Sequence, residues 1–123
     1  MRKGMVMAQY AALLYMPEGS DWMTPEVREE HRVFGAAASQ VIGGAAALYP
    51  TGSAATITVA GGPGGEVLVT DGPYAEAKEI LIGLYLLEAT DLDEAIGWAA
   101  QIPTAWHGKV ELRPVLPVGH RPF

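Results

Sequence analysis

The sequence predicts an α+β domain of the ferredoxin-like type, with the element order βαββαβ and an extra hairpin strand. Three observations lead to this prediction. Apolar segments with strand character alternate with two segments of helical period, a glycine-rich turn separates two short alternating segments, and proline or glycine bounds most elements. Two helices placed in this order cover one face of a mostly antiparallel sheet.

The first element is a strand over residues 9–16. Its sequence, QYAALLYM, is rich in aromatic and aliphatic residues and stops at Pro17. An apolar run of this length is typical of a strand that is buried on both faces. We therefore expect this strand at the centre of the sheet.

The first helix is expected to begin after Thr24, a good N-cap, with Pro25 in the first helical position. Apolar residues then recur at helical period until Gly43 and Gly44 end the pattern. These apolar residues are Val27, Phe34, Ala38 and Val41 or Ile42. His31 lies within this stripe, so we expect its side chain to face the core or a cavity.

A hairpin is predicted in the middle of the chain. Residues 55–60 (ATITVA) alternate like a strand, residues 61–65 read GGPGG, and residues 66–70 (EVLVT) resume the strand pattern. Glycine favours the tight turn that such a hairpin needs. A phosphate-binding loop is the weaker interpretation, because no Gly-Lys-Ser/Thr sequence and no helix follow directly.

The last part of the chain supplies a strand, a helix and a final strand. Residues 80–89 form the strand, and Thr90 or Asp91 caps a helix that runs through Ala100 and stops before Pro103. Residues 109–116 alternate again, and Pro114 indicates that the later part lies at a sheet edge. The expected apolar side of the helix comprises Leu92, Ala95, Ile96 and Ala99.

The composition excludes several functions. The chain has 123 residues, which suits one domain with a single core. Eight Lys and Arg residues against 14 Asp and Glu residues give a formal net charge of −6, and no basic run is present. We therefore expect no direct binding of nucleic acid. The absence of cysteine excludes disulfides, thiolate nucleophiles and metal sites that depend on sulfur.

The organisation along the chain is simple. We expect a lead-in over residues 1–8, which could be disordered, a domain over residues 9–117 and a C-terminal tail over residues 118–123. The apolar residues near the N-terminus lack the small-residue cleavage pattern of a secretory signal. No apolar run approaches the roughly 20 residues that a membrane helix needs. We therefore predict a cytoplasmic protein that has no contact with a membrane.

The sheet face opposite the helices is expected to carry apolar side chains, such as those of Ile57 and Val59 or of Leu84 and Leu86. A domain of this size has no third layer to cover them. Exposed apolar sheet faces usually mark an interface, so we predict a homodimer with the two sheets packed together.

His31 is the first candidate for chemistry. A partly buried imidazole close to a carboxylate titrates near neutral pH, which suits a proton carrier. A structural role in the core is the simpler interpretation of a histidine on an apolar stripe, and residue chemistry alone favours it. His31, His107 and His120 lack the spacing of metal ligands, so we predict no metal site, although ligands assembled only by folding would leave no such pattern.

The second candidate is the segment over residues 68–79, LVTDGPYAEAKE. Lys78 is the only cation between Arg32 and Lys109, and acidic residues surround it. An Asp-Gly-Pro sequence is common in turns. A structural turn with a solvated charge cluster and a functional loop on a rigid scaffold are both compatible with this pattern. The acidic neighbours of Lys78 are Asp71, Glu76 and Glu79.

The stretch from Leu68 to Pro103 resembles the YCII-related family, and specifically its DGPF branch. The signature of that branch is an Asp-Gly-Pro-aromatic turn, an Ala/Phe-Glu-x-Lys-Glu segment, a Gly-aromatic strand and an Asp-x-Asp-Glu-Ala helix start. By motif and element order, the resemblance extends from the first strand to Val115. The residues that match the turn and the segment after it are Asp71, Gly72, Pro73, Tyr74, Glu76, Lys78 and Glu79, with Tyr74 in place of the usual Phe.

The resemblance implies a ferredoxin-like fold that dimerises as an α+β barrel, similar to muconolactone isomerase. It also implies an enzymatic role that depends on a histidine and an aspartate. The histidine maps to His31, whereas the aspartate of classical members corresponds to Ile102, so the classical pair is broken. Asp71 could replace that aspartate only if folding brings it within about 2.6–3.2 Å of His31.

Two hypotheses about function follow, neither of which names the substrate. The first is a small-molecule enzyme that transfers a proton or isomerises a lactone-type substrate without a cofactor. His31 would be the general base or acid, and Asp71 would orient it. Lys78 would neutralise a substrate carboxylate, with Tyr74 and Glu76 lining the site.

The second hypothesis is a non-catalytic protein of the same fold that binds a small ligand or associates with a sigma factor. The resemblance to proteins found beside extracytoplasmic-function sigma factors suggests the latter. An acidic surface suits a basic partner. An open cavity that contains His31 with Asp71 nearby would favour the first hypothesis. A filled interior and an exposed loop from Asp71 to Lys78 would favour the second.

Overall fold

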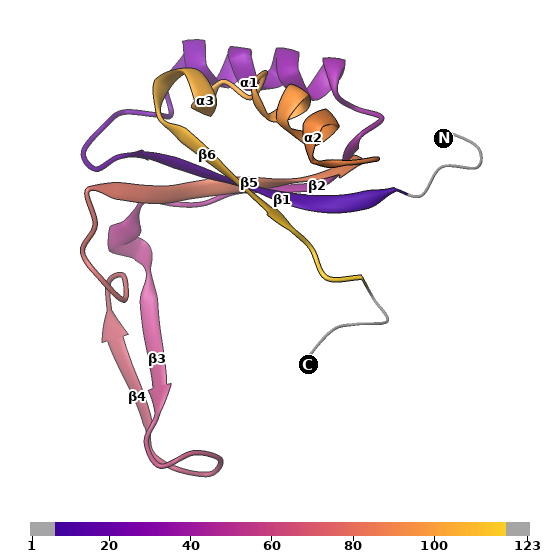
Figure 1. Ribbon diagram of the computed structural model, residues 1–123. Helices are drawn as coiled ribbons and strands as arrows, with labels where there is room; N and C mark the ends of the chain where they lie inside the picture. Colours follow the sequence, from indigo (N-terminus) through magenta and orange to yellow (C-terminus); the bar gives the residue numbers. More distant parts are fainter. Residues whose placement is uncertain (1–6, 118–123) are drawn as a thin grey trace.

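The computed structural model describes residues 7–117, and its centre is a four-stranded antiparallel sheet in the order β2-β5-β1-β6. The helices cover one side of this sheet, and a separate two-stranded hairpin extends from the other side (Figure 1). The elements are β1 (Ala8–Pro17), α1 (Pro25–Ala37), β2 (Ile42–Ala47), the short 3-10 helix η1 (Thr51–Ser53), β3 (Ala55–Val59), β4 (Val67–Asp71), β5 (Glu79–Ala89), α2 (Leu92–Ala99), α3 (Thr104–His107) and β6 (Lys109–Pro114). Without the β3–β4 hairpin the order is βαββαβ, so the ferredoxin-like α+β prediction is confirmed.

β1 lies at the centre of the sheet, as its apolar sequence predicts. It pairs antiparallel with β5 on one side and with β6 on the other. Its alternate residues Tyr10, Ala12, Leu14 and Met16 are buried beneath the helices. The residues between them face the other side of the sheet, because side chains alternate along a strand.

α1 begins as predicted but ends earlier. The Thr24 hydroxyl accepts a hydrogen bond from the Val27 N–H at 3.2 Å, and Pro25 is the first helical residue. The helix ends at Ala37, and residues 42–47 form β2 instead of a continuation toward Gly43. Pairing with β5 provides hydrogen-bond partners for the backbone of β2. Tertiary contacts therefore override the helical preference of the three alanines in β2.

The predicted hairpin is present, but it lies outside the main sheet. β3 and β4 pair with each other and form a two-stranded sheet of their own. In the turn, Gly61, Gly62 and Gly64 adopt positive φ, which glycine accepts without strain. The expectation that Ile57 and Val59 lie on the main sheet is therefore wrong, and β2 occupies the edge position beside β5.

The C-terminal elements follow the predicted order. The Asp91 carboxylate caps α2 by accepting a hydrogen bond from the Glu94 N–H at 2.9 Å. Ala95 and Ala99 are buried, but Leu92 and Ile96 are each 49% exposed, so the buried stripe is narrower than expected. β6 is an edge strand, which agrees with Pro114 at its end. α3 was not predicted.

The core fills the space between the sheet and the helices. It combines aliphatic residues of β1 and β5 with Phe34 of α1 and the fully buried Ile102 after α2. The buried members are Ala12, Leu14, Met16, Phe34, Ala38, Val41, Ile82, Leu87, Ala99 and Ile102.

The expectations for the chain ends fall largely outside the described residues. Residues 1–6 of the expected lead-in, the tail over residues 118–123 and His120 are not described. Ala8, the last residue of the expected lead-in, is the first residue of β1.

Gly83 of β5 allows β2 to approach closely, and its substitution tests this contact. A Cβ atom at this position would lie 2.6 Å from the backbone oxygen of Ala46. We expect Gly83→Ala to lower the free energy of unfolding by about 1–3 kcal/mol, because β2 must shift.

Gly97→Ala is the matched control for this substitution. A Cβ at Gly97 in α2 meets nothing within 4 Å, so the same change there should stabilise the helix by up to about 1 kcal/mol. Urea unfolding of both variants measures the difference, and equal effects would contradict the assignment of the close contact.

Candidate functional site

A cavity of about 370 Å³ lies between α1 and the sheet near β2 and β5. This volume is in the range of small-molecule sites. The first turn of α1 and the loop before it form one wall, and β2 and β5 form the other. The lining residues are Leu14, Trp22, Met23, Val27, Arg28, His31, Ala45, Ala46, Ala47, Ile82, Gly83, Leu84 and Tyr85.

The small side chains of the sheet create this cavity. β2 has the sequence IGGAAA, and Ala45 and Ala47 lie opposite Tyr85 and Gly83 of β5. Methyl groups and a glycine cannot fill the space beneath α1. The larger side chains around this space come from α1, from the loop before it, from Leu14 of β1 and from β5, including Tyr85.

His31 and Tyr85 form a hydrogen-bonded pair in the cavity wall. His31 Nδ1 lies 2.7 Å from the Tyr85 hydroxyl. The two rings are nearly parallel, with centroids 6.0 Å apart and an interplanar angle of 14°. The Phe34 ring packs edge-on against the Tyr85 ring, with the two centroids 5.1 Å apart, and this contact holds the phenol in place. The hydrogen bond uses Nδ1, so Nε2 is the ring nitrogen that remains for a bound molecule.

The surroundings keep both groups of this pair uncharged. Burial of the half-buried imidazole lowers the pKa of His31 below its usual value of 6.5. The Glu30 carboxylate opposes this with a smaller effect on the pKa, and His107 adds a lowering that is smaller still. Burial also raises the pKa of Tyr85 above its usual value. At neutral pH the cavity therefore contains a neutral imidazole next to a protonated phenol.

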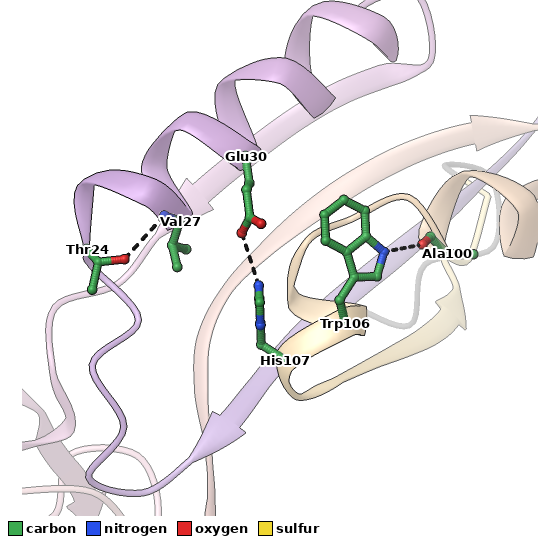
Figure 2. A network of polar contacts seen from close by, with 6 residues as sticks. All are labelled: Thr24, Val27, Glu30, Ala100, Trp106 and His107. Atoms are coloured by element: carbon green, nitrogen blue, oxygen red, sulfur yellow. Dashed lines mark hydrogen bonds and ion pairs between the residues drawn. The ribbon is translucent and has the colours of Figure 1, made fainter.

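Glu30 and His107 form a second pair close to His31, nearer the surface. Glu30 Oε1 and His107 Nε2 are 3.0 Å apart, and the contact joins α1 to α3 (Figure 2). Trp106 of α3 donates its indole N–H to the Ala100 carbonyl at 2.9 Å, as the same view shows. These contacts hold α3 beside α1 and place His107 where its charge affects His31.

Arg28 supplies a positive charge to the cavity. It precedes His31 by three residues on α1, so the two side chains share one face of the helix. Among the residues that line this cavity in the described chain, Arg28 alone carries a formal charge at neutral pH. An anionic group of a ligand would find its counter-charge there.

The residues of the DGPY segment lie elsewhere. Glu76 and Pro73 line a second hollow of about 630 Å³ at the base of the β3–β4 hairpin. Tyr74 is 90% exposed. Lys78 is also exposed, and its carbonyl accepts a hydrogen bond from the Glu18 N–H at 2.7 Å. Tyr74, Glu76 and Lys78 line no part of the His31 cavity as the structure describes it.

The single chain does not join His31 to Asp71. Asp71 is the exposed last residue of β4, on the hairpin that extends from the side of the sheet opposite α1 (Figure 1). Within residues 7–117 the hydrogen-bond partner of the His31 ring is Tyr85. Ile102, at the position of the classical aspartate, is fully buried in the core. A His31–Asp71 pair therefore stays a prediction that one chain alone does not assemble.

Tyr85 and Arg28 are site residues that the sequence pattern does not single out. Tyr85 lies within an apolar strand, ILIGLYLLEA. A signal was present, because a buried tyrosine usually finds a hydrogen-bond partner for its hydroxyl. The identity of that partner, 54 residues away, depends on the fold.

In residues 7–117, no group of three or more His, Cys, Asp or Glu side chains is arranged to hold a metal ion. No helix in that part of the chain has the length and apolar character needed to cross a membrane.

Comparison with known proteins agrees with this architecture. The family model described as the YCII-related domain matches residues 8–119. The chain belongs to the YCII-related family. It is also 36% identical over 115 residues to a protein of Rhizobium meliloti (strain 1021) whose name describes it as uncharacterized. The match covers 86% of this chain and 90% of the relative, so the two proteins correspond over nearly their whole lengths.

The lowered pKa of His31 predicts how stability depends on pH. In the unfolded chain an imidazole has a pKa near 6.5, so unfolded molecules bind the proton more readily than folded ones. Stability should therefore fall as the pH drops through about 6.5, until His31 is also protonated in the folded state.

An NMR titration of the His31 ring in the folded chain, compared with the urea-unfolded chain, measures this shift. In thermal unfolding, His31→Gln should lose less stability between about pH 7 and 5 than the parent protein. A folded-state pKa at or above the unfolded value would contradict the burial of this imidazole.

Proposed function

We propose that this YCII-related protein binds a small organic anion in the cavity beneath α1 and transfers a proton to or from it with His31. The observation that carries the proposal is the hydrogen-bonded His31–Tyr85 pair in the wall of a mostly apolar cavity. A neutral imidazole in such a wall is a competent base at neutral pH.

Tyr85 sets the form in which His31 meets the ligand. When Nδ1–H donates to the phenol oxygen, Nε2 carries a lone pair and accepts a proton. When the phenol donates to Nδ1, Nε2–H is a donor. Both tautomers fit the 2.7 Å contact, so the pair can remove a proton at one position and return one at another.

Such a step requires no cofactor. An isomerisation that removes a proton from one carbon and adds one to another leaves the atoms and electrons balanced, and a lactone-type isomerisation belongs to this class. Arg28 would hold a carboxylate of the substrate, because it is the charged residue at the cavity wall. The apolar lining would enclose the rest of the molecule and exclude water from Nε2.

A second candidate function is a non-catalytic, regulatory role. The observation that favours it is the exposed loop at the base of the hairpin, where Tyr74 is 90% exposed and the adjoining hollow is lined by Glu18, Glu76 and Glu79. An acidic surface with an exposed aromatic ring suits a basic protein segment, such as one from a sigma factor.

Two narrower assignments belong to this proposal. We assign the chain to the DGPF branch of the family, on the match of residues 71–74 and 76–79 to its signature. We also propose a homodimer formed through the side of the sheet without helices. Leu13 lies opposite Leu84 there, and Ala11 lies opposite Leu86, which leaves an apolar centre.

The role of Arg28 predicts a preference for anions. In thermal-shift and calorimetric titrations with small carboxylic acids and lactones, carboxylates should stabilise the protein more than their neutral esters or amides. Arg28→Met should weaken carboxylate binding by about 10- to 100-fold, since a charge-assisted hydrogen bond contributes about 1.5–3 kcal/mol.

Arg32→Met is the control for this experiment. Arg32 lies one turn further along α1 and is not among the residues that line the cavity. Its Nη2 atom lies 2.6 Å from Glu29 Oε2, so the two side chains form an ion pair. The removal of Arg32 should leave affinity unchanged. Equal losses in the two variants would show that overall charge, and not the cavity, attracts the ligand.

Proton transfer by His31 can be tested without knowledge of the product. Ligands found in the binding screen are incubated with the protein in D2O, and NMR follows the exchange of their acidic C–H protons for deuterium. His31→Gln should slow this exchange by about 10²- to 10⁴-fold while the ligand still binds.

His107→Gln is the matched histidine control, because His107 contacts Glu30 outside the cavity lining. This variant should retain exchange. If a ligand binds in the cavity but its protons exchange no faster than in buffer, the protein binds without catalysing, and the second candidate function gains support.

A further inference from the structure

The hairpin of β3 and β4, here called the arm (residues 55–71), projects from the body of the molecule. Figure 1 shows it leaving one end of the four-stranded sheet and extending on the side opposite the helices. Its two strands form a sheet of their own in the described chain. Most of the arm therefore faces solvent.

One face of the arm is aliphatic. Ile57 lies opposite Val69 and Val59 lies opposite Val67, and residues at alternate positions share a face. These four side chains form what we call the aliphatic face. Ile57 is 65% exposed, and Val67 and Val69 are each 61% exposed. The other face consists of Thr56, Thr58, Leu68 and Thr70.

An arm of this kind is unfavourable in water by itself. A hairpin of two strands is marginally stable when nothing packs on it, and exposure of its aliphatic face adds a hydrophobic cost. Exposed β-branched strands of low charge also tend to associate with other chains. A cover over the aliphatic face would remove both problems.

The open face of the four-stranded sheet lies on the same side as the arm. Its apolar centre includes Leu13 and Leu84, which are opposite each other. On this face its edge at β6 carries Lys109, Glu111 and Arg113, because these residues alternate with the residues of β6 that pack under the helices. Lys109 Nζ lies 2.7 Å from Glu79 Oε1, so Arg113 is the cation of this edge that can attract an acidic surface. The arm carries Glu66 and Asp71 and has no Lys or Arg.

The length of the arm suits a second copy as the occupant. β3 has five residues, which extend about 17 Å at about 3.4 Å per residue. Sheets packed face to face lie about 10 Å apart. A second copy that covers the open face would therefore lie within reach of the arm, and two-fold symmetry would repeat the contact in the opposite direction.

We propose that the aliphatic face of the arm packs against the body of a second copy seated on the open face of the sheet. This proposal rests on the homodimer included in the proposed function. In the dimer each arm lies across the partner, and Ile57 and Val69 are buried at the contact. The same contact stabilises a hairpin that one chain leaves uncovered.

The oligomeric state of full-length variants tests the proposal. Sedimentation and light scattering should find a dimer for the parent chain. The Ile57→Asp/Val69→Asp variant should raise the dimer dissociation constant by about tenfold or more, because an aspartate cannot be buried there without a partner. Thr58→Asp, on the other face of the same strand, should leave the dissociation constant unchanged. Circular dichroism confirms that each variant is folded.

A second measurement locates the contact. The chain has no cysteine, so Val69→Cys introduces a single thiol on the aliphatic face and Thr58→Cys a single thiol on the other face. Alkylation of the thiol at position 69 should be about tenfold slower above the dissociation constant than after dilution below it. The thiol at position 58 should react at the same rate in both conditions.

Leu13→Asp, at the centre of the open face, separates the two proposals. A dimer that Leu13→Asp breaks and the arm variant leaves intact would overturn the arm contact and support the sheet-face dimer. A dimer that only the arm variant breaks would overturn the sheet-face dimer and, with it, the placement of the arm on a copy seated there. A parent chain that stays monomeric at every concentration would overturn both, without affecting the ligand and proton-exchange tests of the cavity.

Discussion

The cavity beneath α1 depends on the lack of large side chains in β2. The strand supplies one isoleucine, two glycines and three alanines, and it pairs with β5 next to Gly83. The backbone of the sheet is therefore complete beneath α1, but the layer of side chains that would fill the interior is missing. Elsewhere the same interface is packed tightly around Leu87 and Ile102, both fully buried. The cavity is thus a local interruption of the core, bounded by rigid elements.

The apolar wall also determines the electrostatics of the site. Burial disfavours the charged forms of His31 and Tyr85, so both remain neutral near pH 7. Their 2.7 Å hydrogen bond fixes the orientation of the imidazole. Ile102, at the position where the family resemblance implies an aspartate, is part of the core. In the described chain the hydrogen-bond partner of the His31 ring is a neutral phenol from β5.

The sheet divides the molecule into two sides with different chemistry. The helix side contains the cavity with His31, Tyr85 and Arg28. The other side presents an apolar sheet face and the arm, whose base carries the DGPY segment. Because strands direct successive side chains to opposite faces, the same strands β1 and β5 serve both sides. A ligand site on one side and a contact between copies on the other can therefore coexist in a chain of 123 residues.

The sequence by itself determined the elements whose signals are local. The Thr24 and Asp91 caps, the period of α1 that turned His31 inward, the apolar run of β1 and the glycine turn of the hairpin all act over a few residues. Tertiary structure decided what depends on distant partners. The alanines after α1 favour a helix locally, but pairing with β5 makes them a strand and opens the cavity. Tyr85 is an unremarkable strand residue until folding places it against His31. Asp71 lies at the end of a strand both in the sequence prediction and in the structure, and only the departure of that strand from the main sheet separates it from the imidazole.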